Sequence, residues 1–207
     1  MTQKKNKGSL RENTEAIIIA IIIAMFIRTF IVQAFKIPSG SMLETLQIGD
    51  QILVNKFIYG VKIPFTNGTV LIPFREPVKG DIVVFKYPED PTKDFIKRVV
   101  ATQGDTVEII NKQLYVNERR VENEPYANYR DRHMLPLSMT TRDNMPKITV
   151  PGGKLFVMGD NRDNSHDSRF WGYVDVTAIK GKAFIIYWSW NRDRFGIRWD
   201  RIGDIIK

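Results

Sequence analysis

The sequence predicts a mostly β protein with one N-terminal membrane-spanning helix, and two observations support this prediction. Residues 16–35 form a nearly continuous apolar run of twenty residues, about the length that a helix needs to cross a bilayer. Behind this run, short segments rich in Val, Ile, Phe and Tyr alternate with turn residues, without a 3.6-residue periodicity. We therefore expect a cytoplasmic segment at 1–15 and a β-sheet or partly closed β-barrel domain at 36–207, with a small inserted lobe at 111–152.

Composition excludes several kinds of chemistry. The 207 residues suffice for one sizeable core, and the absence of cysteine rules out disulfides, thiolate nucleophiles and cysteine zinc sites. The only histidines are His133 and His166, so a multi-histidine metal site is not expected. The net charge of +8 suits an anionic partner, either nucleic acid or lipid, but the charge is scattered along the chain as on an ordinary solvated surface.

The apolar run allows two interpretations. Residues 16–27 read AIIIAIIIAMFI, and Arg28 interrupts the run near its end, where a long cationic side chain can reach the interface. One interpretation is a retained anchor. The other is a cleaved secretory signal with Val32-x-Ala34 as the cleavage site, against which the charge of Arg28 argues. In both, the basic N-terminus stays in the cytoplasm and the remaining chain crosses.

Seven segments after the run have the composition of β-strands, and Gly-Asp pairs lie at strand edges. The region 111–152 differs because it is polar and contains little continuous apolar sequence. The predicted strands are residues 51–60, 81–88, 95–102, 106–110, 113–117, 154–160 and 182–190.

A possible nucleophile lies directly behind the apolar run. Phosphate-loop, HExxH and GxSxG motifs are missing, but Pro38-Ser39-Gly40-Ser41-Met42 forms a turn. Such a turn can present the Ser41 hydroxyl and a backbone N–H to the same point, as acyl transfer requires. The alternative is a plain linker leaving the membrane, since Ser, Gly and Pro are standard loop residues.

Serine needs a base, and lysine is one candidate. Strand alternation puts Phe95, Lys97 and Val99 on one face, so Lys97 has apolar neighbours that could desolvate its amine and lower its pKa. Arg98 has similar neighbours, however, and most strand lysines extend to water. His133 or His166 could form a Ser–His pair instead, although nothing in the sequence connects either to Ser41.

A third constellation is the polar stretch 160–169 behind Gly159. It reads DNRDNSHDSR and is explained either as a loop with Asx turns or, less well, as a calcium loop that lacks the EF-hand glycine and glutamate. As part of a catalytic site, Asp167 and Arg169 would brace the site while Ser165 orients the lysine.

Taken together, these blocks resemble those of bacterial type I signal peptidases. The matching motifs are IPSGSM (37–42), GDIVVFKYPED (80–90), FIKRVVA (95–101) and MGDNRDNSHDSRFWG (158–172). The resemblance implies a membrane-anchored serine endopeptidase with a Ser–Lys dyad and a mostly β domain outside the membrane, without metal or cofactor. It also favours a retained anchor over a cleaved signal.

The resemblance also assigns roles to individual residues. Ser41 would be the nucleophile and Lys97 the general base, Ser39 would share the oxyanion hole with the Ser41 N–H, and Ser165 would hold the lysine. Asp167 and Arg169 would form a supporting ion pair, Asp160 would belong to the same block, and Met42 would line a shallow pocket for small substrate residues. Three departures from the family pattern, Glu44, Ala101 and Gln103, put loop shape in doubt rather than chemistry.

The partners implied are preproteins that bear signal peptides, the lipid bilayer and, as a further candidate, the export translocon, but not nucleic acid. The expected location is the bacterial inner membrane, with a single pass and the catalytic domain on the outer face. Alternatives are another Ser–Lys peptidase, such as a self-cleaving repressor-type or a pilus-processing enzyme, and an inactive anchored β domain. Nucleic-acid binding by the C-terminal tryptophans and arginines is a third, although those residues also suit a membrane interface.

Overall fold

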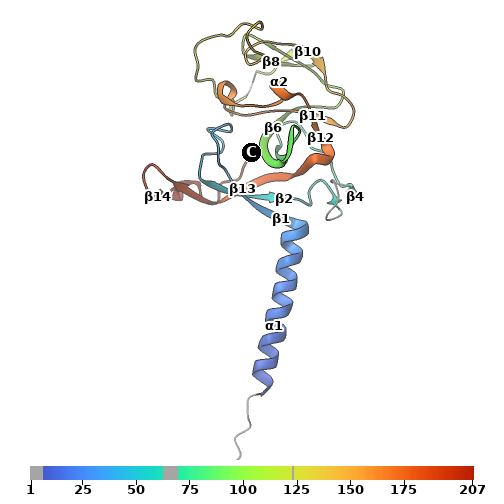
Figure 1. Ribbon diagram of the computed structural model, residues 1–207, viewed down its shortest axis with the longest axis vertical. Coiled ribbons are helices and arrows are strands. Elements are labelled where there is room, and N and C mark those ends of the chain that lie inside the picture. Colours follow the sequence, from blue (N-terminus) through green and yellow to red (C-terminus); the bar gives the residue numbers. More distant parts are fainter. Residues whose placement is uncertain (1–6, 63–69, 123) are drawn as a thin grey trace, which may run out of the picture.

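The computed structural model describes residues 7–62, 70–122 and 124–207. The first described element is helix α1 (Lys7–Phe26), which continues as the π-helical turn η1 (Ile27–Ile31) and projects from a β domain (Figure 1). Residues 32–35, which the sequence analysis included in the apolar span, are instead part of strand β1 (Val32–Lys36). These residues are extended because β1 pairs antiparallel with strand β2 (Asp50–Asn55). The hydrogen bonds between the two strands take the place of those that a longer helix would have made.

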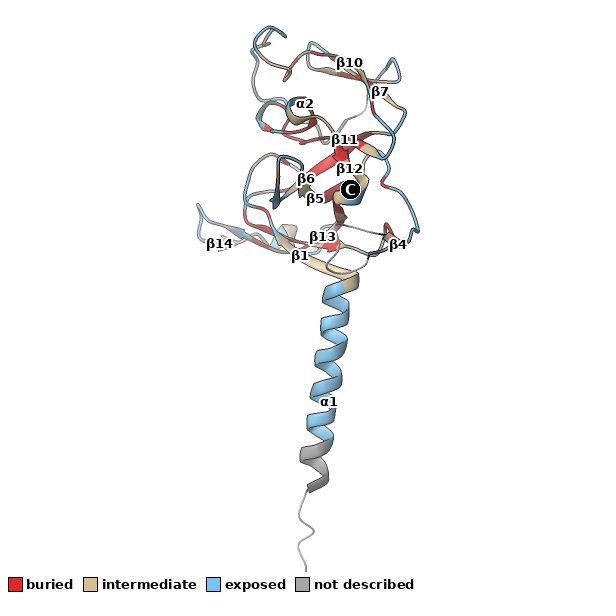
Figure 2. Cartoon of the chain, turned by 45° about the vertical axis from the view of Figure 1, so that its right-hand side comes forward, coloured by how far each residue is buried: buried red, intermediate tan, exposed pale blue. Residues whose placement is uncertain are grey.

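No residue of the N-terminal helix whose exposure the structure describes is buried. The span Glu12–Ile31 has a mean hydropathy of 2.2, and none of it is buried. The isoleucine side chains of α1 are exposed (Figure 2). A helix that is apolar all round must be covered by protein or by lipid. By length and composition, this one can cross a membrane.

The main sheet is antiparallel and carries most of the domain. All seven predicted strands are present, five of them in this sheet, and the prediction of a mostly β fold is confirmed. Its order is β1-β2-β13-β5-β6-β11-β12, with β14 attached to β13, and the described strands do not close into a barrel. The remaining bounds are β5 (Ile82–Tyr87), β6 (Asp90–Thr102), β11 (Lys154–Met158), β12 (Val174–Asp175), β13 (Ile179–Asn191) and β14 (Gly196–Ile197).

The inserted lobe is a second antiparallel sheet of order β10-β7-β8-β9. Its first strand, β7, begins at Thr106 and pairs with β8 and β10 rather than with the main sheet. The strands are β7 (Thr106–Ile110), β8 (Gln113–Val116), β9 (Arg119–Arg120) and β10 (Met145–Thr149). The short elements are β3 (Val61–Lys62), β4 (Val70–Ile72), α2 (Ser168–Trp171), and the 3-10 turns η2 (Arg162–Asn164), η3 (Val176–Ala178) and η4 (Trp199–Arg201).

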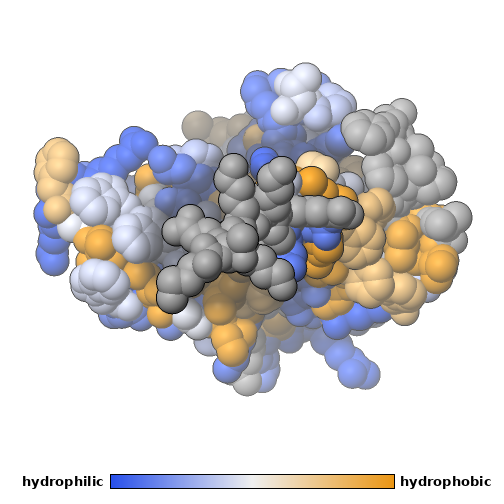
Figure 3. All heavy atoms as spheres, turned by 90° about the horizontal axis from the view of Figure 1, so that it is seen from below, coloured by the Kyte–Doolittle hydropathy of each residue, from blue (hydrophilic) through white to orange (hydrophobic). Residues whose placement is uncertain are grey.

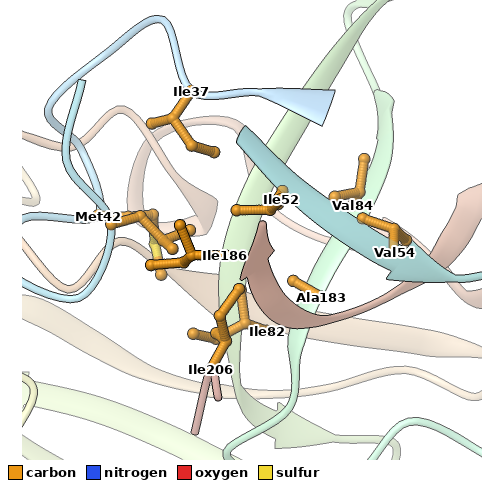
Figure 4. Packing of buried hydrophobic residues seen from close by; sticks show 10 residues of the cluster. Ile37, Met42, Ile52, Val54, Ile82, Val84, Ala183, Ile186 and Ile206 are labelled. Atoms are coloured by element: carbon orange, nitrogen blue, oxygen red, sulfur yellow. The ribbon is translucent and has the colours of Figure 1, made fainter. Parts of the chain in front are cut away.

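Strand β5 is buried on both faces, which shows how the core is divided. Ile82 and Val84 belong to one apolar cluster, and Val83 and Phe85 belong to another. Since successive side chains alternate between faces, the two clusters lie on opposite sides of the main sheet. Figure 4 shows the first cluster, in which residues of β2, β5 and β13 meet Met42 and the C-terminal Ile206.

Candidate active site

Ser41 lies on a turn that the core holds in place. Strand β1 ends at Lys36, and the next residue, Ile37, is tied to the start of β2 by two backbone hydrogen bonds, Ile37 N to Asp50 O (2.8 Å) and Gly49 N to Ile37 O (3.0 Å). Met42, directly after Ser41, is fully buried in the first apolar cluster. Ile37 and Met42 are buried, whereas Ser41 between them is half-buried at the surface of the turn.

Lys97 meets Ser41 from the middle of the sheet. It lies on β6, between β5 and β11, and only 4% of the residue is exposed. Its Nζ donates a hydrogen bond to Ser41 Oγ at 2.6 Å. The amine also lies 5.6 Å from the centre of the Phe95 ring, on the face that strand alternation predicts. Two residues that are 56 positions apart thus form a close contact.

Burial lowers the pKa of the Lys97 amine from its usual value of 10.5 to about 8. The nearby charges partly cancel, since Asp167 and Asp160 raise this pKa while Arg169 lowers it. Desolvation is therefore the main cause, because it disfavours the charged form of an amine that has no carboxylate in contact. Near neutral pH an appreciable fraction of the amine is unprotonated.

Arg98 is buried as deeply as Lys97, on the other face of β6, but it is paired. Its Nε and Nη2 donate to the two carboxylate oxygens of Asp160, both at 2.8 Å, and the Thr45 hydroxyl adds a third hydrogen bond of 2.6 Å to this carboxylate. The ring of Tyr126 covers the guanidinium at 3.7 Å. The sequence analysis placed Asp160 in this block but did not identify Arg98, Thr45 or Tyr126 as its companions.

The loop behind β11 is organised by Asp167 and Arg169. Arg169 Nε and Nη2 donate to the Asp167 carboxylate at 2.8 and 2.9 Å, and the same carboxylate accepts from Gly159 N at 3.0 Å. Burial alone would raise the pKa of Asp167, but the charge and hydrogen bonds of Arg169 outweigh it and lower that pKa. Arg169 also donates to the carbonyl of Arg162, so this ion pair fixes the path of the loop.

Asn161 joins this loop to the Ser41 turn. Its backbone N–H donates to Ser41 O (3.1 Å), and its side-chain Nδ2 donates to Gly40 O (2.9 Å). Gly159 allows the approach, because a Cβ there would lie 2.4 Å from Ser41 O and 2.2 Å from Ser165 Oγ. Sequence reasoning missed Asn161. The polar stretch 160–169 predicted the loop, but it did not indicate that the Asn161 side chain contacts the Ser41 turn.

The other predicted residues are nearby but make fewer contacts. Ser39 is exposed on the turn, and within the described chain neither its hydroxyl nor the Ser41 N–H donates a hydrogen bond. Ser165 is buried next to Gly159, yet its hydroxyl makes no hydrogen bond to Lys97 and instead lies near the Asp167 carboxylate, whose pKa it helps to lower. Met42 is covered by its neighbours and presents no open pocket.

Both histidines are engaged elsewhere. The His166 ring lies 3.2 Å from the Tyr87 hydroxyl through Nε2 and stacks on Phe170. His133 is largely exposed and contacts Asp131. Within the described residues, neither ring hydrogen-bonds Ser41, so the arrangement gives a Ser–His pair no support.

The acidic residues of the loop are already used by protein donors. Asp160 binds Arg98, Asp163 accepts from Lys112 at 2.7 Å, and Asp167 binds Arg169. Among the residues that the structure describes, no group of three or more His, Asp or Glu is arranged to hold a metal ion.

The three departures from the expected pattern have ordinary surroundings. Glu44, beside the Ser41 turn, forms an ion pair with Arg130 of the inserted lobe. Ala101 is buried in the core of that lobe, and Gln103 accepts a hydrogen bond from Gly153 N at 3.0 Å. None of the three contacts the Ser41–Lys97 pair.

Comparison with known proteins identifies the family of this chain. A model of the family described as signal peptidase, peptidase S26, matches residues 10–188. Signal peptidase I of Pseudomonas aeruginosa is 40% identical, over 91% of this chain and 76% of that relative, and signal peptidase I of Aquifex aeolicus is 36% identical, over 87% and 85%. A solved signal peptidase I structure from Enterococcus faecalis is 27% identical, covers 53% of this chain and 97% of that one, and has a TM-score of 0.41. The chain belongs to the signal peptidase family, peptidase S26, and is a serine endopeptidase.

Proposed function

We propose that this protein is a membrane-anchored endopeptidase that removes signal peptides from exported preproteins, with Ser41 as nucleophile and Lys97 as general base. The observation that carries the proposal is the 2.6 Å contact between Ser41 Oγ and a buried amine whose pKa is lowered to about 8. A nucleophilic serine needs a base within hydrogen-bond reach, and an amine can serve only while it is unprotonated.

The chemistry follows from this contact. Neutral Lys97 accepts the Ser41 proton as Oγ attacks the scissile carbonyl, and the resulting ammonium returns the proton to the leaving amine. Water then attacks the acyl-enzyme with Lys97 again as base, the ester bond to Ser41 Oγ breaks, and Lys97 passes the proton from water to Oγ. The Ser41 N–H and the Ser39 hydroxyl, which donate to nothing in the described chain, are available to the developing oxyanion. Ser165, in a different side-chain rotamer, would orient the lysine, and Asp160, Asp167 and Arg169 would hold the surrounding loops.

Strand β1 supports the mode of substrate binding. It pairs only with β2, so its other edge is unpaired in the described chain, and it leads directly to the Ser41 turn. An extended peptide can add to such an edge by backbone hydrogen bonds. Met42 and Ile37, near the nucleophile, are both buried and leave no deep pocket there, which favours small residues before the cut.

The same strand supports anchoring. Helix α1 and η1 run directly into β1, so an enzyme held by this helix would present its cleavage site to peptides that leave the membrane (Figure 1). The basic N-terminal residues favour a cytoplasmic start, with the β domain on the outer face of the bacterial inner membrane. Protease added to spheroplasts should release the β domain, whereas a mature protein that starts at Phe35 or later would contradict a retained anchor.

Cleavage of a model preprotein tests the proposal. The detergent-solubilised full-length protein should remove the signal peptide, and Ser41→Ala should bind the preprotein without cutting it. Leucine in place of alanine at the last position before the cut should abolish cleavage by steric clash. Binding without cleavage by the unmodified protein would instead identify an inactive export-associated domain.

A further inference from the structure

A large cavity lies where the helix meets the β domain. It measures about 1380 Å³, above the roughly 300–1,000 Å³ of common ligand pockets, and neither Ser41 nor Lys97 lines it. Ala24, Ile27 and Phe30, at the end of the helical segment, form one wall. The other walls come from strands β1, β2, β12 and β13, from the turn between β5 and β6, from η3 and from the start of β11. The cavity therefore lies between the end of the helix and the β domain. Seen from the side on which the helix leaves, hydrophobic residues lie on both sides of it, with hydrophilic ones among them (Figure 3).

The lining carries far more positive than negative charge. Two cations have a carboxylate partner: Lys154 pairs with Asp175 at 2.8 Å, and Lys180 pairs with Asp94 at 2.6 Å. Asp175 is the one carboxylate among the lining residues. The lining cations are Arg28, Lys56, Lys86, Lys154 and Lys180.

Three of these cations have no counterion in the described chain. Arg28 and Lys86 form no ion pair there, and Lys56 Nζ donates only to the carbonyl oxygen of Thr29, at 2.5 Å. Burial and the charge of Lys180 both lower the pKa of Lys56. Cations that face a shared space without a counterion create a site for an anion.

The occupant must be anionic and also apolar, because the charged groups share the cavity with the end of an exposed apolar helix. We propose that this cavity binds one anionic phospholipid, with its phosphate at Arg28, Lys56 and Lys86 and its acyl chains along α1. The guanidinium of Arg28 can hold two phosphate oxygens at once, and the lysines act as point charges. A zwitterionic lipid would bring its own cation into this site and bind more weakly. The inference rests on the proposed membrane span, but not on the proposed peptidase activity.

Native mass spectrometry of the full-length protein in a neutral detergent tests the proposal. With phosphatidylglycerol and phosphatidylcholine of equal chain length as probes, we expect one bound phosphatidylglycerol in clear preference. The double variant Lys56→Gln/Lys86→Gln should bind it about tenfold more weakly or worse. Arg119→Gln/Lys147→Gln removes the same charge from exposed positions on the second sheet and should bind normally. Ser41→Ala should also bind normally, which separates this site from catalysis.

Several results would overturn the proposal. They are equal binding of the two lipids, unchanged binding by Lys56→Gln/Lys86→Gln, equal loss in the control variant, and saturation by inorganic phosphate at the concentrations at which the lipid saturates. Loss of preprotein binding by the cavity variant in lipid-free detergent would assign the cavity to the substrate instead. Should the double variant lower Tm, Lys86→Gln alone replaces it, because that side chain makes no hydrogen bond in the described chain.

Discussion

Strand β6 carries a buried cation on each face, and the two cations differ in their partners. Lys97, on one face, has a serine hydroxyl as its hydrogen-bond acceptor and no carboxylate in contact, and burial lowers its pKa to about 8. Arg98, on the other face, has a bidentate carboxylate in Asp160 and the ring of Tyr126 above it. The residues are neighbours in sequence and equally buried, so the difference lies in what each face packs against.

This difference separates a reactive cation from a structural one. A buried charge without a counterion is costly, and the cost makes its neutral form accessible. A buried charge with a well-aligned counterion remains charged and ties distant segments together. Substitutions of the two residues should therefore have opposite effects on activity and on stability.

Removal of the base should produce the largest effect. We expect Lys97→Arg to lower kcat/KM by about 10³-fold or more, because guanidinium keeps its proton and cannot accept another. Single-turnover cleavage of a preprotein measures the loss, with Lys93→Arg, an exposed change on the same strand, as the control. A near-normal rate in Lys97→Arg would remove the lysine from the mechanism.

Replacing the two cations by methionine should change the free energy of unfolding in opposite directions. Arg98→Met leaves the Asp160 carboxylate buried without its partner and should cost about 3–5 kcal/mol in the free energy of unfolding. Lys97→Met removes an unpaired buried amine and should stabilise the domain, by about 1 kcal/mol or more at pH 7. Denaturant unfolding of both variants gives the comparison. Destabilisation of similar size in both would show that the two cations have the same role.

The pH dependence follows from the pKa of Lys97. The amine must be unprotonated to act, so kcat/KM should fall below pH 8, by about tenfold for each unit and about 100-fold at pH 6. The same shift predicts that stability rises with pH between about 8 and 10.5, where the unfolded lysine holds a proton that the folded one has lost. This rise should vanish in Lys97→Met. A cleavage profile that stays flat from pH 6 to 9 would contradict the assignment.

Loss of the hydrogen bond from Asn161 to the Ser41 turn should reduce the cleavage rate moderately. Asn161→Asp keeps the shape of the side chain but replaces the donor to Gly40 O by an acceptor, so the turn should shift. We expect kcat to fall about 10- to 100-fold with little change in KM. Asn164→Asp, on an exposed position of the same loop, makes the same chemical change and should keep normal kinetics. Equal losses in both variants would point to the charge rather than to positioning.

Replacing either histidine by alanine should have the smallest effect on the cleavage rate. His166→Ala removes a contact with Tyr87, and His133→Ala removes a surface contact with Asp131, but neither ring contacts Ser41. Cleavage rates within about twofold of the unmodified enzyme are expected, as for surface changes in general. An inactive His166→Ala variant together with an active Lys97→Arg variant would instead support a Ser–His site.

Much of this organisation could be inferred from local patterns alone. The apolar run identified the helix, short alternating segments identified the seven strands, and alternation placed Lys97 and Arg98 on opposite faces. These inferences succeed because helix and strand periodicity are properties of neighbouring residues. The same rules failed at residues 32–35, where an apolar stretch reads equally well as the end of a helix or as a strand, and pairing with β2 decides.

The contacts that distinguish the two cations depend on residues far away in the chain. Ser41 is 56 positions from Lys97, and Asp160 is 62 positions from Arg98, so no periodicity connects either pair. Only the order of the strands and the packing of the loop behind β11 decide which cation meets a hydroxyl and which meets a carboxylate. Local patterns in the chain specify the helix, the strands and the candidate residues. The partners of these residues depend on the fold, because burial and charge pairing arise only when distant segments pack together.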